Sequence, residues 1–305
     1  MTKFAFFEGE IVPIEQAQIS ITNHTFHYGT GCFAGIRGYW NSDKSQMYVF
    51  RLPEHFERFI HSANFLHCKL GFSNEQLQQA TLDLIRKEQW QRNIYIRPIA
   101  YKEKDIFQVW LHDADDKVAI FSQPTGDYLP ANKGINVMVS SWRRVDDTAI
   151  PARGKVNGTY VNSALAKSDA MLSSFDEAIL LNQDGHISEA TAANFMMVRN
   201  GEIITPPINA NLLEGVVRRS LLELARNELG LTVIERDIDR SELYMADEAF
   251  FCGTGVQMAS ISSVDHRPVG SGQIGEVASK LGKLFYEVLI GEVPKYQHWV
   301  TPVYP

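Results

Sequence analysis

The sequence is poor in cysteine. Cys32, Cys68 and Cys252 are the only cysteines among the 305 residues, and their odd number and wide spacing argue against a disulfide framework or a zinc site built on a CxxC pair. We interpret all three as small apolar side chains in the protein core. Free cysteines of this kind suit a reducing compartment, so we expect a cytoplasmic protein with no metal site.

The sequence also lacks long apolar runs and dense clusters of positive charge. Glu8, Glu10 and Glu15 interrupt residues 1–20, which therefore do not form the apolar core of an export signal. No later segment reaches the roughly 18 uninterrupted apolar residues of a membrane span. The formal net charge is −7 and no Lys/Arg cluster could neutralise a row of phosphates, so we expect small-molecule partners, and neither nucleic acid nor a membrane.

The composition is that of an ordinary globular protein. Hydrophobic residues make up 45% and charged residues 21% of the chain, and 305 residues are enough for two domains. Residues 122–134 contain prolines and glycines but no hydrophobic period, so we place an interdomain loop there. The expected domains are a small one over residues 1–121 and a larger one over residues 135–305.

Periodicity predicts several secondary-structure elements. Residues 93–101 alternate as in a strand, with Tyr95 and Arg97 on one face, and Pro98 indicates a sheet edge. Residues 51–66 predict a helix with apolar side chains at helical spacing, namely Phe56, Phe59, Ile60 and Ala63. Residues 177–205 predict three short antiparallel strands, because the turn-forming pairs Asp184-Gly185 and Asn200-Gly201 separate them.

One lysine lies where a solubilising lysine is not expected. Lys155 stands in the loop sequence GKVNG, between Gly154 and Gly158, just before a run that predicts an amphipathic helix. A lysine that serves solubility normally lies on the polar face of a helix, where its charge stays hydrated. Lys155 therefore needs a chemical explanation.

Two glycine-flanked segments could bind a phosphate group. A helix is predicted to begin after Gly215 and to stop at Gly230, so backbone N–H groups are available at Val216 and Val217. The second segment is CGTGV, residues 252–256, which adds the hydroxyl of Thr254. Each segment alone is a weak signal, because many helices begin after glycine and bind nothing.

A loop lysine, a carboxylate beyond a hairpin, an arginine and two amide-rich turns are together the groups that pyridoxal phosphate chemistry needs. The lysine amine forms an imine with the cofactor aldehyde, and a desolvated site beside other cations favours the neutral amine. The carboxylate keeps the pyridine nitrogen protonated, so that the ring can act as an electron sink.

These residues belong to sequence blocks that resemble fold-type IV pyridoxal phosphate aminotransferases, most closely the branched-chain amino acid aminotransferases. The resemblance covers almost the whole length, and its blocks occur in the family's order: FHYGTGCFAGIRGY, EHFERFIHSA, YIRP, VSSWRR, GKVNGTYVNSALAKSDA, DEAILLNQDGHISEATAANF, LLEGVVRRSLLELA and ADEAFFCGTG. It implies a two-domain α/β (α+β) fold, with a smaller N-terminal α/β domain and a larger C-terminal domain built on a barrel-like antiparallel or mixed sheet.

The resemblance implies roles for individual residues. Lys155 would be the Schiff-base lysine that also moves the proton at Cα, and Glu189 the acid that pairs with the pyridine nitrogen. Tyr160 would contact the phenolic oxygen and Arg58 the phosphate. The remaining implied cofactor contacts are Leu213, Val216, Val217 and Thr254, and the implied substrate-binding residues are Tyr28, Phe33, Gly35, Tyr95, Arg97, Tyr128, Thr254 and Gly255. Arg97 is the candidate partner for the second carboxylate of 2-oxoglutarate or glutamate.

Some positions depart from the family's pattern. Val217 stands where the family often has a threonine, Ala34 where a glutamate is common, and alanines replace the glycine-rich run after Glu189. Residues 101–118 are more charged than expected and align poorly, so we consider them a possible contribution to a partner subunit's pocket. These differences bear on the substrate range more than on the reaction type.

The leading hypothesis is a ping-pong aminotransferase that passes the amino group of L-leucine, L-isoleucine or L-valine to 2-oxoglutarate. A D-amino acid or (R)-amine aminotransferase, an aminodeoxychorismate lyase and a binding protein without catalytic activity remain alternatives. The resemblance also implies a homodimer or a hexamer of dimers.

Overall fold

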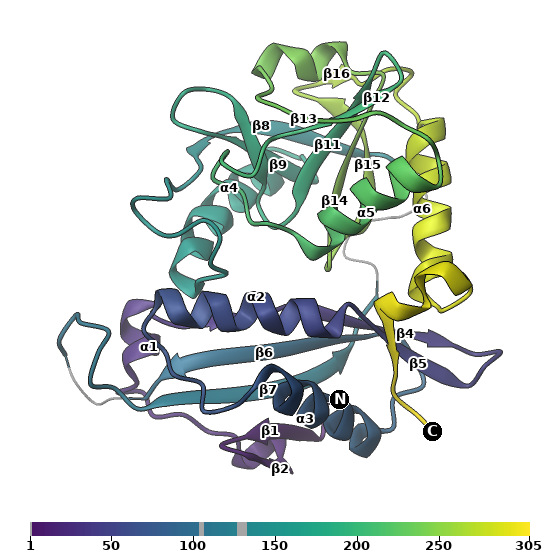
Figure 1. Ribbon diagram of the computed structural model, residues 1–305. Coiled ribbons are helices and arrows are strands. Elements are labelled where there is room, and N and C mark those ends of the chain that lie inside the picture. The colour runs from purple at the N-terminus through teal and green to yellow at the C-terminus, as the bar shows by residue number, and fades with distance from the viewer. Residues whose placement is uncertain (1, 104–106, 127–132) are drawn as a thin grey trace. The chain divides into compact units, whose positions relative to one another are not determined.

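Two β-sheets, one in each of two compact units, organise the chain (Figure 1). The computed structural model describes residues 2–103, 107–126 and 133–305. The first unit comprises residues 1–126, 154–158 and 287–305, and the second comprises residues 127–153 and 159–286. The predicted α/β class is confirmed.

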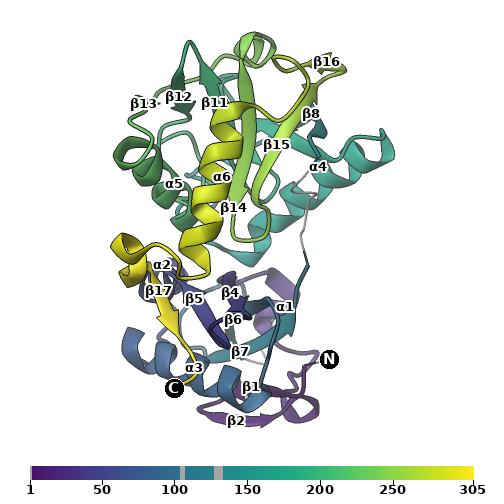
Figure 2. The same ribbon diagram turned by 90° about the vertical axis from the view of Figure 1, so that its right-hand side faces the viewer.

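The sheet of the first unit is antiparallel throughout its described strands, in the order β17-β5-β4-β6-β7-β1-β2, with β3 also paired to β6. Its strands are β1 (Phe4–Phe7), β2 (Glu10–Pro13), β3 (Cys32–Phe33), β4 (Ile36–Asn41), β5 (Gln46–Phe50), β6 (Ile94–Lys102), β7 (Asp116–Pro124) and β17 (Val300–Pro302). The last strand of the chain, β17, lies beside β5, so the C-terminal segment completes the N-terminal sheet (Figure 2).

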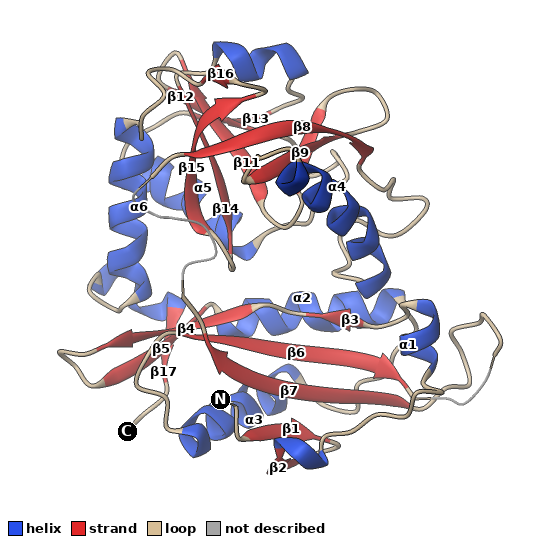
Figure 3. Ribbon diagram, turned by 180° about the vertical axis from the view of Figure 1, so that it is seen from behind, coloured by secondary structure: helices blue, strands red, loops and turns tan. Residues whose placement is uncertain are grey.

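The prediction that Pro98 marks a sheet edge is wrong. Strand β6 lies between β4 and β7, and it runs beside β7 along its whole length (Figure 3). The carbonyl of Pro98 accepts a hydrogen bond from the N–H of Ala34, which lies in the break between β3 and β4. The N and O atoms of one strand residue point to the same side, so the missing N–H of Pro98 faces this break rather than a continuous neighbouring strand.

The helices of the first unit pack against this sheet. They are α1 (His24–Tyr28), α2 (Leu52–Phe65) and α3 (Asn74–Glu88), with 3-10 turns η1 (Ile14–Gln16) and η4 (Pro294–Trp299). Helix α2 contacts β3 and α3, and α3 contacts β1 and β7. The predicted apolar stripe of α2 is confirmed at Phe56, Phe59 and Ala63, which are all buried, and Ile60 is half-buried.

The sheet of the second unit is mixed, in the order β10-β9-β8-β15-β14-β11-β12-β13, with β16 paired to β15. Its strands are β8 (Ile135–Arg143), β9 (Glu177–Leu181), β10 (Ile187–Ala190), β11 (Asn194–Arg199), β12 (Glu202–Thr205), β13 (Val233–Glu235), β14 (Glu248–Gly253), β15 (Gln257–Val264) and β16 (Arg267–Pro268). Strand β8 is parallel to both β9 and β15, and β12 is parallel to β13.

Residues 177–205 form four strands rather than the predicted three. The chain leaves the strand conformation at residues 191–193, which divides the expected middle strand into β10 and β11. Strand β10 then pairs with β9, whereas β11 pairs with β12 and β14. The predicted tight turn at Asn200-Gly201 is confirmed, because both residues have positive φ, 54° and 78°.

The helices of the second unit are α4 (Tyr160–Leu172), α5 (Val216–Asn227) and α6 (Glu276–Leu289), although residues 287–289 of α6 group with the first unit, and the second unit also contains the 3-10 turn η3 (Arg240–Met245). The 3-10 turn η2 (Asn157–Thr159) begins in residues of the first unit and ends at the first residue of the second. Helix α4 packs on β8 and β9, and α5 contacts β14. Helix α5 begins directly after Gly215, as predicted.

Both compact units are discontinuous in the sequence. Residues 154–158 group with the first unit because their backbone forms hydrogen bonds with residues 29–33. Residues 287–305 group with it because β17 pairs with β5. The three cysteines are free and buried, as predicted. Within the described ranges, no helix has both the length and the apolar character needed to cross a bilayer.

Candidate active site

The Lys155 loop is held by backbone hydrogen bonds to the segment that leads into β3. The N–H of Phe33 donates to the carbonyl of Lys155 at 3.0 Å, and the N–H of Asn157 donates to the carbonyl of Gly31 at 2.8 Å. Between these bonds, Cys32 and Val156 form an antiparallel bridge. The predicted loop lysine is therefore attached to the edge of a sheet.

Helix α2 supplies a second support for the lysine. The N–H of Lys155 donates to Oγ of Ser62 at 3.0 Å, and this hydroxyl donates in turn to the carbonyl of Arg58 at 2.8 Å. Ser62 is completely buried, whereas Lys155 and Arg58 are half-buried. One hydroxyl thus connects the backbones of two residues expected to bind the cofactor, and the sequence analysis did not identify it.

Four of the predicted substrate-binding residues lie together in the first unit. The Phe33 ring has two cations over it, Lys155 Nζ at 4.9 Å and Arg97 Cζ at 4.3 Å from its centroid. Arg97 Nη2 donates to the Tyr95 hydroxyl at 3.1 Å. That hydroxyl lies against Gly35, where an added Cβ would be 2.1 Å from it, so only glycine leaves room for Tyr95 in this position.

A further arginine lies beside this group. Arg37 is opposite Tyr95 in the register of β4 and β6, is 2% exposed, and donates from Nη2 to the carbonyl of Gly126 at 3.0 Å. Arg37 was not predicted from the sequence, although it stands in the FAGIRGY block. Of the other predicted substrate residues in this unit, Tyr28 ends α1 with its ring 4.8 Å from that of His24. Tyr128 lies outside the described residues.

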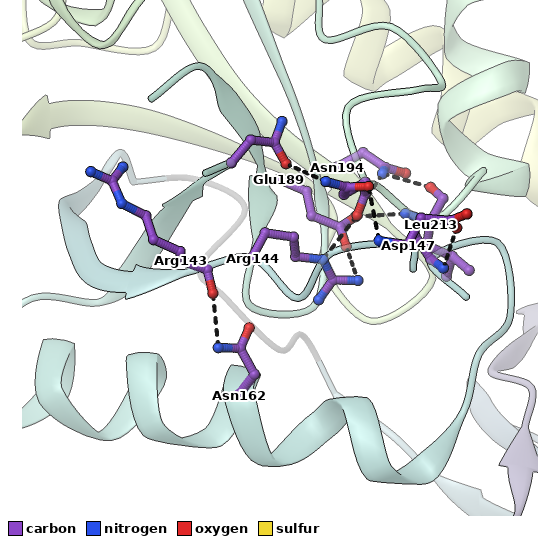
Figure 4. A network of polar contacts seen from close by, with 10 residues as sticks. Arg143, Arg144, Asp147, Asn162, Glu189, Asn194 and Leu213 are labelled. Atoms are coloured by element: carbon purple, nitrogen blue, oxygen red, sulfur yellow. Dashed lines mark hydrogen bonds and ion pairs between the residues drawn. The ribbon is translucent and has the colours of Figure 1, made fainter. Parts of the chain in front are cut away.

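In the second unit, Glu189 is the centre of a buried polar network (Figure 4). Arg144 Nη2 lies 2.8 Å from Glu189 Oε1, and Asn194 Nδ2 donates to Oε2 at 3.0 Å. The N–H of Leu213 also donates to Oε2, at 3.3 Å. All these partners are donors, so the network favours the ionised carboxylate. Arg144 and Asn194 were not predicted, although both stand in quoted sequence blocks.

A β-bulge determines the direction of the Glu189 side chain. Glu189 pairs with Leu180, and the register shifts between Ile187 and Glu189, so that Ser188 is an extra residue in β10. Ile187 and Ala190 both belong to the apolar core cluster of the unit, which a regular strand would not allow for residues three apart. The bulge therefore turns Glu189 away from this cluster, to the face where Leu180 packs with residues of α4.

Both predicted amide-rich segments lie next to this network. Gly215 precedes α5, and the N–H groups of Val216 and Val217 are in the first turn of the helix, where intrahelical acceptors are missing. Thr254 and Gly255 lie in the turn between β14 and β15. This turn follows Cys252, which is paired with Asn194 across β14 and β11. Tyr160 is the half-buried first residue of α4.

The two cysteines near these groups are not nucleophiles. Burial raises the pKa of Cys252 to about 12. Burial also raises the pKa of Cys32, whose neighbour Phe33 bonds to Lys155. Both thiols therefore stay protonated at neutral pH, and Lys155 is the nucleophile that the described groups offer.

The residues present fit pyridoxal phosphate by their chemistry. The first unit offers an amine on Lys155 and a guanidinium on Arg58. The second offers a buried, donor-bonded carboxylate on Glu189 and the free amide end of α5. A ring nitrogen that must stay protonated matches such a carboxylate, and a phosphate matches a helix N-terminus and an arginine.

Comparison with known proteins agrees with this chemistry. The family model for amino-transferase class IV matches residues 31–264. The chain is also 44% identical over 301 residues to a protein of Aquifex aeolicus named "Probable branched-chain-amino-acid aminotransferase", with 99% of this chain and 97% of that relative covered.

Solved structures show the same fold. The branched-chain aminotransferase of Thermoproteus uzoniensis, crystallised with norvaline, is similar with a TM-score of 0.95 at 35% identity, covering 100% of both chains. The branched-chain amino acid aminotransferase of Thermobaculum terrenum in its PLP-bound form is similar with a TM-score of 0.95 at 35% identity, covering 100% of this chain and 99% of that one. Because both the family model and a full-length relative match, this chain belongs to the class IV aminotransferase family, of fold type IV, and is a transaminase.

Proposed function

We propose that this transaminase uses pyridoxal phosphate to pass the amino group of L-leucine, L-isoleucine or L-valine to 2-oxoglutarate in a reversible ping-pong reaction. The observation that carries the proposal is the Glu189 network, in which a buried carboxylate accepts from Arg144, Asn194 and Leu213 beside the first turn of α5. A buried charge is costly unless it serves a ligand or a partner, and here the donors keep it ionised for a protonated ring nitrogen.

We assign the cofactor-binding groups as follows. Lys155 would hold the cofactor covalently through its amine and, once released, would move the proton at the substrate Cα. Glu189 would bind the ring nitrogen and Tyr160 the phenolic oxygen, while Leu213 would pack against the ring. Phosphate would be bound by Arg58, the N–H groups of Val216 and Val217, and Thr254. When bound, pyridoxal phosphate would supply the aldehyde carbon that takes up the amino group and the electron-withdrawing ring that stabilises the charge left at the substrate Cα.

The substrate side must accommodate an aliphatic side chain and, in the other half-reaction, a second carboxylate. Phe33 and Tyr95 offer aromatic walls, and the guanidinium of Arg97 lies over both of their rings. We propose that Arg97, oriented by its bond to the Tyr95 hydroxyl, binds the second carboxylate of 2-oxoglutarate. Tyr28, Gly35, Tyr128, Thr254 and Gly255 complete the proposed substrate-binding residues. The norvaline named with the Thermoproteus uzoniensis structure supports an aliphatic substrate.

We also propose that the protein is a cytoplasmic homodimer or a hexamer of dimers. Its three free, buried thiols suit a reducing compartment. The apolar residues Phe26, Phe107 and Val109 are 69%, 74% and 75% exposed, and we propose that a second subunit covers them. Light scattering during size-exclusion chromatography tests this: a monomer at micromolar concentration would contradict it.

Spectroscopy and product analysis test the reaction. The purified protein with pyridoxal phosphate should be yellow, lose this colour with L-leucine alone, and form glutamate when 2-oxoglutarate follows. Borohydride reduction and peptide mapping should attach the cofactor to Lys155, and Lys155→Met should lose both label and turnover. Absence of glutamate would contradict the proposed reaction. Activity with D-leucine or an (R)-amine instead of L-leucine would indicate the stereochemical alternative, and pyruvate release without an acceptor would indicate a lyase.

A further inference from the structure

The side-chain amide of Asn194 connects Glu189 to the segment that precedes α5, in addition to the direct bond from the N–H of Leu213 to Glu189 Oε2. Asn194 Nδ2 donates to Glu189 Oε2 at 3.0 Å and to the carbonyl of Leu213 at 2.9 Å. Both hydrogens of this nitrogen are therefore used. Asn194 is the first residue of β11 and is only 4% exposed, so water does not compete for these bonds.

The other end of the same amide lies against the helix start. A Cβ added to Gly215 would be 2.1 Å from Asn194 Oδ1 and 3.3 Å from its Cγ. Gly215 has φ −70° and ψ 129°, values that any residue adopts. Space for the Asn194 amide, rather than backbone conformation, is therefore the reason for glycine at this position.

Arg144 makes a parallel connection. Its Nη2 lies 2.8 Å from Glu189 Oε1, and its Nε donates to the carbonyl of Asn211 at 3.0 Å. Within the segment before α5, residues 211 and 213 are thus both tied to the carboxylate. Asn194 is the connection closest to α5, because it touches both Leu213 and Gly215.

We propose that Asn194 is a positioning residue that couples the two ends of the cofactor site. Its amide holds the Glu189 carboxylate and the N-terminus of α5 in one fixed arrangement. The group that would bind the ring nitrogen and the N–H groups that would bind the phosphate are then already correctly placed relative to each other before the cofactor binds. This inference rests on the proposed function, which assigns these two groups to the ring nitrogen and the phosphate. In the free protein, such pre-organisation reduces the ordering entropy that binding would otherwise cost.

The coupling predicts that a substitution at the start of α5 also changes the environment of the cofactor ring. In Gly215→Ala, the added methyl group conflicts with Oδ1 of Asn194, the residue whose amide nitrogen donates to Glu189. The variant should therefore alter the visible absorption band of the bound cofactor, which reports on the ring, as well as the 31P chemical shift of its phosphate. Asn194→Ala should alter both signals too and should weaken pyridoxal phosphate binding about tenfold or more.

A double variant shows whether the two substitutions act through the same contact or cause two independent defects. In Asn194→Ala/Gly215→Ala the conflicting oxygen is gone, and the next atom near the added methyl group is Arg218 Cβ at 3.3 Å. The double variant should therefore bind pyridoxal phosphate no more weakly than Asn194→Ala alone. The unfolding midpoints of the cofactor-free proteins should show the same non-additivity, which provides a readout independent of activity.

Asn41 provides a matched control in the first unit. It is 6% exposed, and its Nδ2 also donates to a carbonyl, that of Ile290 at 3.0 Å, and to a carboxylate, that of Glu292 at 2.8 Å. Asn41→Ala should lower the unfolding midpoint but leave the absorption band and the 31P shift unchanged.

The possible outcomes distinguish the inference from the proposed function. If Gly215→Ala changes only the 31P signal, or if the effects of the two single variants add, the coupling through Asn194 is refuted. If the wild-type protein gives no bound 31P signal and no borohydride label on Lys155, the proposed function fails instead. If Asn194→Ala does not fold, Gly215→Ala by itself still tests the coupling, because the coupling requires this variant to change the absorption band.

Discussion

The backbone N–H of Lys155 donates a hydrogen bond to the side-chain hydroxyl of Ser62 at 3.0 Å, although the two residues are 93 positions apart in the sequence. The hydroxyl in turn donates a hydrogen bond to the carbonyl of Arg58, so helix α2 supports the lysine directly. The adjacent carbonyl of Lys155 is bonded to the N–H of Phe33. The backbone of the lysine is therefore fixed on both sides, and only its side chain extends from this support.

Ser62→Ala should impair both stability and catalysis. The variant leaves the buried N–H of Lys155 without its acceptor, which costs about 1–3 kcal/mol of folding free energy. A shift of the lysine by a fraction of an ångström should lower kcat about tenfold or more. The control is Thr81→Val in α3, which removes a comparable buried hydroxyl bonded to the carbonyl of Leu77. Equal losses of kcat in both variants would show that Ser62 has no special role.

Arg144→Met should destabilise the protein strongly, because it leaves Glu189 as a buried carboxylate without its cation. Removing one partner of a buried pair costs about 3–5 kcal/mol, measurable as the free energy of unfolding in urea. Arg143, the preceding residue, is exposed and points away from Glu189 in Figure 4, so Arg143→Met should change stability by less than about 0.5 kcal/mol. Adding Glu189→Gln to Arg144→Met should restore part of the loss, and no restoration would argue against the charge explanation.

Gly35→Ala should raise KM for 2-oxoglutarate more than KM for L-leucine. The new Cβ would lie 2.1 Å from the Tyr95 hydroxyl, so Tyr95 must move and its bond to Arg97 must break. A lost hydrogen bond to a charged group corresponds to about tenfold or more in affinity, so KM for 2-oxoglutarate should rise by that factor and KM for L-leucine by less. Gly126→Ala is the control, because within the described chain its Cβ would meet no atom within 4 Å. An equal rise of both KM values would contradict the role of Arg97.

His186 should make stability depend on pH. Its hydrogen bond to Asp184 raises the pKa of His186 above 6.5 and lowers the pKa of Asp184 below 3.8, and Asp237 and Asp239 also favour the charged imidazole. The contribution of His186 is thus complete below pH 6.5 and is lost as pH rises through its folded pKa, while that of Asp184 is lost as pH falls through its own lowered value. The unfolding midpoint of the wild type should exceed that of His186→Gln most near pH 5–6, and the difference should shrink toward pH 8. A difference between the two midpoints that stays constant from pH 5 to pH 8 would contradict the role of His186.

Local patterns predicted those elements whose shape depends on near neighbours. The helical spacing of Phe56, Phe59 and Ala63 predicted α2, and their burial confirms the stripe. Positive φ at Asn200 and Gly201 confirms the hairpin read from that dipeptide. The edge assignment from Pro98 failed because a missing N–H does not reveal which side of the strand faces a gap. The division of β10 from β11 was missed because the sequence EATAAN carries no glycine or proline to mark a break.

The chemistry-bearing residues were identifiable from the sequence by itself, because an amine, a carboxylate and an amide-rich helix start are properties of single residues and short segments. Lys155 and Gly215 were singled out in this way, whereas the role of Glu189 was implied by the family resemblance. The groups that orient them, Ser62, Arg144 and Asn194, were decided only by the tertiary structure. Each of these three residues is ordinary within its own segment and acquires its role through contacts with other segments of the chain. The direction of the Glu189 side chain likewise depends on a β-bulge. Such contacts depend on how strands and loops pair, which no local pattern specifies.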